Sequence, residues 1–129
     1  EGKKPNVKTM TVLDSSALLV FLFGGRGNEV VKGNLEGSAI GAASWSEVLT
    51  KIEGRVERSL VESLLFAFGL VIEPVTRADA TRAAIIHQSN PSLSLGDRLC
   101  LALGERLEAD VLTADRAWGN VNGIIQIRT

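Results

Sequence analysis

The sequence predicts an α/β protein with a central parallel sheet of four to five strands and helices on both faces. Short aliphatic and β-branched runs alternate along the chain with helical patterns, as expected when crossover helices connect parallel strands. With 129 residues and 45% hydrophobic content, the chain is long enough for one domain with its own core. We expect this domain at residues 10–129, after a polar stretch at 1–9 that is typical of a flexible tail or an expression remnant.

The individual elements follow from hydrophobic periodicity and from turn-forming residues. Strands are predicted where short apolar runs stop at polar residues, glycine or proline, namely at 10–13, 38–42, 70–75, 110–113 and 124–127. Helices are predicted where apolar residues recur every three or four positions, namely at 16–23, 28–35, 44–52, 60–68, 76–88 and 96–107. Residues 116–118 are predicted to form one short helical turn.

Composition excludes several classes of protein. The 14 basic and 15 acidic residues argue against a protein that binds nucleic acid through a broad positive field, but a metal-dependent nuclease remains compatible. Cys100 is the only cysteine, which excludes an internal disulfide and predicts a buried core residue in a reducing compartment, with a catalytic thiol as the alternative. No apolar run is long enough to span a membrane, and we expect a cytoplasmic location.

Four acidic residues occur where strands end or where the helices after them begin. Asp14 follows the first strand and Asp115 follows the fourth, whereas Glu47 and Asp97 lie in the first turns of two predicted helices. Because the carboxyl ends of parallel strands share one edge of a sheet, these side chains are expected to lie near one another. Asp110 precedes the fourth strand and is expected at the opposite edge.

Each of these acids also has a purely structural interpretation. Asp14 and Asp115 could be helix N-caps, and the pairs Ser44 with Glu47 and Ser94 with Asp97 have the spacing of a capping box. Four carboxylates at one edge would nevertheless repel each other unless a divalent cation compensates their charge. Oxygen ligands without histidine or cysteine favour Mg²⁺ or Mn²⁺ over zinc.

The same acids carry a resemblance to a known family. Four short motifs, in order along the chain, resemble the acidic motifs of PIN domains, and most closely those of VapC-type toxins of bacterial toxin–antitoxin pairs. They are 12–18 (VLDSSAL), 46–48 (SEV), 93–97 (LSLGD) and 112–118 (LTADRAW). The sequence departs from many relatives at Trp45, where a small residue or asparagine is common, and at Arg116 to Trp118, where some relatives carry a further acid.

The resemblance implies a three-layer PIN-like domain and a metal-dependent endoribonuclease that inhibits translation by cleaving RNA, such as tRNA or rRNA. Asp14, Asp97 and Asp115 would hold Mg²⁺, with Mn²⁺ as a substitute, and Glu47 would complete the catalytic set. Ser15 or Thr113 would fix a carboxylate or a metal-bound water, and Arg116 would contact a phosphate.

The resemblance also implies a cognate antitoxin and a homodimer. The helix at 16–23 carries more apolar residues than one buried stripe needs, so the surface 18–23 is a candidate for antitoxin binding. Burial of this helix on two sides of its own domain is the alternative. Two other functions remain open: a catalytically silent PIN-like module that binds RNA or protein, and an aspartyl-phosphate hydrolase. The second needs an acid two residues after Asp14, where this chain has Ser16.

Overall fold

The computed structural model describes residues 10–119 and 123–128, so the tail predicted at 1–9 lies outside the described residues. Five strands form one sheet in the order β3-β2-β1-β4-β5, and every neighbouring pair is parallel. The strands are β1 (Thr11–Leu13), β2 (Ala39–Gly41), β3 (Val71–Glu73), β4 (Asp110–Thr113) and β5 (Ile124–Gln126). The prediction of an α/β fold with a parallel sheet is therefore confirmed.

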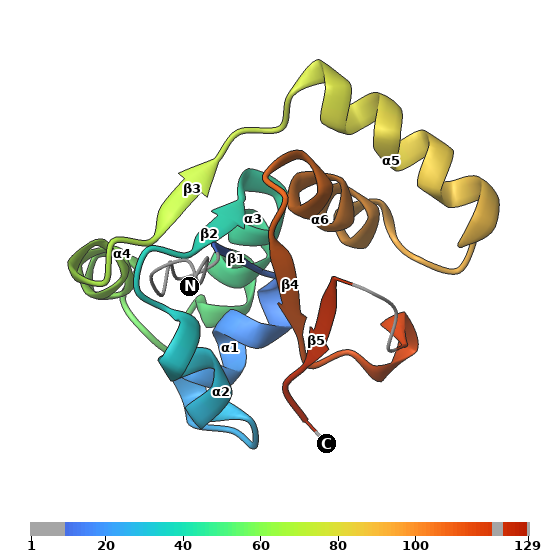
Figure 1. Cartoon of the computed structure of the whole chain (residues 1–129). Helices are drawn as coiled ribbons and strands as arrows, with labels where there is room; N and C mark the ends of the chain where they lie inside the picture. The colour runs from blue at the N-terminus through green and yellow to red at the C-terminus, as the bar shows by residue number, and fades with distance from the viewer. Residues whose placement is uncertain (1–9, 120–122, 129) are drawn as a thin grey trace, which may run out of the picture.

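Helices cover both faces of the sheet (Figure 1). One face is packed by α1 (Ser15–Phe23), α2 (Asn28–Asn34), α3 (Ala42–Ile52) and α4 (Arg58–Ala67). On the other face α6 (Leu95–Arg106) contacts β1, β2 and β4, while α5 (Arg77–Ser89) packs along its outer side. A 3₁₀ turn, η1 (Arg116–Trp118), follows β4. No helix in the described ranges combines the length and the apolar character that crossing a bilayer would require.

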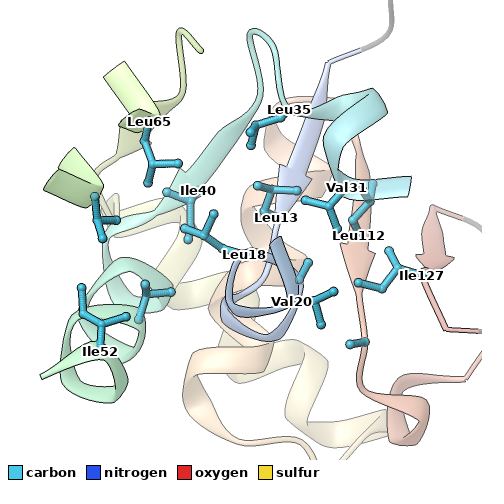
Figure 2. Close-up of a cluster of buried hydrophobic side chains, with 14 residues drawn as sticks. Leu13, Leu18, Val20, Val31, Leu35, Ile40, Ile52, Leu65, Leu112 and Ile127 are labelled. Atoms are coloured by element: carbon cyan, nitrogen blue, oxygen red, sulfur yellow. The ribbon is translucent and has the colours of Figure 1, made fainter. Parts of the chain in front are cut away.

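Strand alternation divides the core into two clusters. Leu13 and Leu112 point into the larger cluster beneath α1 to α4, part of which is drawn in Figure 2, and both are completely buried. Val12 and Val111, one residue earlier on the same strands, point into the smaller cluster beneath α6. Because both faces of the sheet are buried, these strands carry uninterrupted apolar runs, and such runs predict buried strands.

The chain reverses direction along the sheet next to its central strand. From β1 it proceeds to β2 and β3 on one side, and the α5–α6 crossover then carries it to β4 and β5 on the other side. The backbone N–H of Asp14, just after β1, donates to the carbonyl of Leu112 at 3.1 Å. The carboxyl ends of β1 and β4 therefore lie side by side at a topological switch point, where open α/β sheets bind their ligands.

Among the helix boundaries that differ from the prediction by one or two residues, the start of α3 changes the account of a candidate site residue. Helix α3 begins at Ala42, directly after β2, and its N-cap is Gly41 without a side-chain hydrogen bond. Ser44 and Glu47 therefore lie inside the helix, and the predicted capping box between them is wrong. Ala42 and Ala43 are strong helix formers, so the helix starts before the serine is reached.

Candidate active site

The hub of the site is the carboxylate of Asp14, which is only 4% exposed. It caps α1 by accepting a hydrogen bond from the backbone N–H of Ala17 at 2.8 Å. Ser16 Oγ lies 2.7 Å from its Oδ1, and Thr113 Oγ1 donates to its Oδ2 at 2.6 Å. The N-cap interpretation of Asp14 is thus confirmed, and the same carboxylate is also held by a hydroxyl from the neighbouring strand.

Two hydroxyl groups join the end of β1 to the end of β4. Ser16 Oγ accepts from the backbone N–H of Ala114 at 2.9 Å, and Thr113 Oγ1 accepts from that of Asp115 at 3.0 Å. Thr113 contacts the Asp14 carboxylate as predicted, whereas the serine that contacts it is Ser16 and not the predicted Ser15. In a helix starting at residue 15, the second serine faces the sheet edge, and this could have been recognised only with the helix start fixed.

The buried position of Asp14 changes its ionisation. Burial raises the pKa of Asp14 to about 6; the hydrogen bonds from Thr113, Ser16 and Ala17 oppose this rise, and the negative charge of Asp97 adds to it. The group therefore titrates close to neutral pH. A nearby cation would favour its ionised form.

Asp97 and Glu47 lie at the same edge of the sheet, on α6 and α3. Asp97 completes a capping box with Ser94, as predicted: its backbone N–H donates to Ser94 Oγ at 3.2 Å and its Oδ2 accepts from the Ser94 N–H at 3.4 Å. The buried thiol of Cys100 lies among these acids. Burial first, and then the charges of Asp14, Asp97 and Glu47, raise its pKa well above the usual range. Such a thiol is a core group and a poor nucleophile.

Asp115 completes the set from the turn after β4. It is half-buried and caps η1, because its Oδ1 accepts from the backbone N–H of Ala117 at 2.9 Å. Gln126 on β5 fixes this turn, since its side-chain amide donates to the carbonyls of Asp115 and Gly119 at 2.9 and 3.0 Å. Arg116 is exposed, and Asp110 lies at the start of β4, away from this edge, as expected.

The four acids share one edge of the sheet, but their carboxylates do not converge. Within 10–119 and 123–128, no group of three or more acidic, histidine or cysteine side chains is placed to hold a metal ion. Three of the acids are instead engaged by their own helices, through Ala17, Ser94 and Ala117. Their assignment as metal ligands therefore stays a prediction.

Comparison with known proteins identifies the fold. The family model described as PIN domain matches residues 11–124. A toxin-antitoxin complex from Klebsiella pneumoniae is similar in structure, with a TM-score of 0.80, 18% sequence identity and coverage of 91% of this chain and 97% of that chain. PAE2754 from Pyrobaculum aerophilum is similar with a TM-score of 0.62, 18% identity and coverage of 93% and 85%. No curated protein sequence matches the chain.

Proposed function

This chain belongs to the PIN domain family, and from that premise we propose that it is a metal-dependent endoribonuclease acting as the toxin of a toxin–antitoxin pair. The observation that supports this proposal is the buried carboxylate of Asp14 at the switch point of the sheet, with the charge of Asp97 acting on it. A buried acid near a second acid is costly to ionise, which suits a site that gains a cation.

The donor set fits Mg²⁺, because it consists of carboxylate oxygens. We assign Asp14, Asp97 and Asp115 as the residues that would hold the ion, with Mn²⁺ as a substitute. When bound, such a cation supplies a water of lowered pKa and stabilises negative charge on the phosphate. For Asp97 and Asp115, binding would compete with the capping bonds to Ser94 and Ala117.

The other residues have three proposed roles: they fix the Asp14 carboxylate, orient a water, or contact a phosphate. Ser16 and Thr113 fix the plane of the Asp14 carboxylate through their hydroxyls. Glu47 is an exposed residue, so its carboxylate can orient a water and accept its proton. Arg116 is exposed beside Asp115 and can contact a phosphate oxygen of the RNA backbone.

We expect the purified protein to cleave RNA only when a divalent ion is present. End-labelled RNAs with structured and single-stranded regions should be cut internally with Mg²⁺ or Mn²⁺ and remain intact with EDTA. A parallel calorimetric titration measures whether Mn²⁺ binds. Binding of RNA without cleavage at any metal concentration would instead identify a catalytically silent PIN module.

A protein antitoxin is the proposed partner, and the outer part of α1 is its proposed contact surface. Leu22 is half-buried and Phe23 is 39% exposed, so the helix is not enclosed by its own domain. The guanidinium of Arg55 covers the Phe23 ring at 4.1 Å from its centroid. The structural neighbour from Klebsiella pneumoniae is itself a toxin-antitoxin complex, which supports a partner of this kind.

We also propose that the protein is a homodimer and that it is cytoplasmic. Sedimentation analysis of the purified protein would check the homodimer.

Replacing Phe23 with serine is expected to weaken binding of the proposed cognate antitoxin by about tenfold, because a large apolar contact is lost at the interface. RNA cleavage should be unchanged, since Phe23 is at the far end of α1 from Asp14. Met10→Ser provides a control, because it removes another exposed apolar side chain outside this helix. Equal antitoxin affinity for wild type and the Phe23 variant would remove α1 from the interface.

A further inference from the structure

A glycine in the first turn of α6 lies directly against the carboxylate of Glu47. A Cβ atom added at Gly96 would lie 3.2 Å from Oε2 and 3.3 Å from Oε1 of Glu47. Such separations are shorter than ordinary van der Waals contact, so a side chain at position 96 would push the carboxylate aside by a few tenths of an ångström. The absence of a side chain at Gly96 therefore leaves the space that Glu47 occupies.

From this contact we infer that Gly96 is a positioning residue for Glu47; the inference rests on the proposed nuclease function. Glu47 reaches from α3 across to the first turn of α6, where Asp97 follows Gly96 directly. The N-terminal turn of a helix favours negative charge, which helps to hold both acids there. Gly96 thus allows the carboxylate of Glu47 to lie against the first turn of α6.

The position of this glycine needs an explanation of this kind. Glycine has the lowest helix propensity of any residue except proline. Gly104, in the same helix, has a clear packing reason, because an added Cβ would lie 2.5 Å from Val111 Cγ2. At Gly96 the three atoms nearest to an added Cβ all belong to the Glu47 carboxylate. The contact is therefore with a candidate catalytic group and not with the core.

The test compares Gly96→Ala with a matched glycine. Gly33→Ala in α2 is the control, because an added Cβ there meets nothing within 4 Å. Both variants should unfold at temperatures no lower than wild type, since alanine favours the helix. Gly96→Ala should bind Mn²⁺ about tenfold more weakly and cleave RNA more slowly, with the loss in kcat rather than KM, as expected when a group next to the ligands is displaced. Gly33→Ala should match wild type in both measurements.

A double-mutant cycle identifies the residue through which Gly96 acts. In the Glu47→Ala background, Gly96→Ala should cause no further loss of Mn²⁺ affinity, because the carboxylate that it displaces is gone. An undiminished effect in that background, or wild-type behaviour of Gly96→Ala alone, would overturn the inference. A metal-free crystal structure of Gly96→Ala separates this inference from the proposed function. Glu47 should be displaced there whether or not the wild type cleaves RNA, and an unmoved carboxylate would refute the positioning role.

Discussion

Asparagine at position 14 is expected to abolish metal-dependent RNA cleavage while leaving the fold intact. The substitution removes the negative charge at the switch point but keeps the side-chain volume, and the amide oxygen can still accept from the Ala17 N–H. Loss of a carboxylate from a metal site of this kind should lower the cleavage rate by about 10³-fold or more. Initial rates on a labelled RNA at saturating Mg²⁺ measure the effect.

Matched variants test whether the loss is specific to the proposed site. Asp97→Asn should be equally inactive, because it belongs to the same edge of the sheet. Asp110→Asn is the control, since Asp110 lies at the opposite end of β4 and should keep wild-type activity. Undiminished cleavage by both Asp14→Asn and Asp97→Asn would exclude the site assignment.

The same Asp14 variant has a second expected effect, on stability in the absence of metal. The folded protein holds the pKa of Asp14 at about 6, above its ordinary value of 3.8, because the ionised group is buried. The folded state therefore binds the Asp14 proton more tightly than the unfolded state does. The stabilisation that this proton gives is complete below pH 3.8 and is lost as the pH rises through 6. Wild type should become less stable relative to Asp14→Asn by about 3 kcal/mol over that interval. Urea unfolding at pH 4 and pH 7 in EDTA checks the sign.

Replacing Arg106 with methionine is expected to lower the free energy of unfolding by about 2 kcal/mol, because it leaves a buried carboxylate short of hydrogen bonds. Arg106 donates to both oxygens of Asp79, at 2.8 and 3.1 Å, and also to the carbonyl of Pro74 at 3.4 Å. Asp79 is buried at the start of α5 and keeps only its capping bonds when the arginine is removed. The pair connects the start of α5 to the end of α6.

Lowering the pH should reduce the difference in the free energy of unfolding between wild type and Arg106→Met. Burial acts to raise the pKa of Asp79, but the bonds from Arg106 and Thr76 outweigh it and hold the pKa below 3.8. The stabilisation is therefore present above pH 3.8 and lost as the pH falls through the lowered value. Arg82→Met is the control, because its bond to Glu105 is exposed and should contribute much less. Equal urea midpoints for both variants would contradict this account.

The fold was predictable from the sequence because the strands are buried on both faces. Val12 with Leu13, and Val111 with Leu112, are apolar at consecutive positions, and each strand is followed by a cap or a helix start. Because consecutive strands are parallel, the sequence also predicts Asp14 and Asp115 at the same edge of the sheet. Local chemistry also identified Ser94 and Asp97 as a capping box correctly.

Side-chain geometry at the site was less predictable, because it depends on helix starts within one or two residues. A helix that begins at Ala42 removed the expected cap at Ser44, and one that begins at Ser15 brought Ser16 to Asp14. The orientation of the carboxylates also depends on their bonds to backbone N–H groups, which engage Asp14, Asp97 and Asp115. Side-chain orientation of this kind is not encoded in a short sequence pattern.

The hydrogen bond between Thr113 and Asp14 also has a consequence for biosynthesis. Its two residues are 99 positions apart, so β4 must leave the ribosome before the carboxylate of Asp14 acquires its full set of partners. Pairings of such separation form late, because a long loop must close first. We therefore expect a nascent chain that ends before β4 to lack the proposed ribonuclease activity. Ribosome-bound chains stalled at increasing lengths would show where cleavage begins.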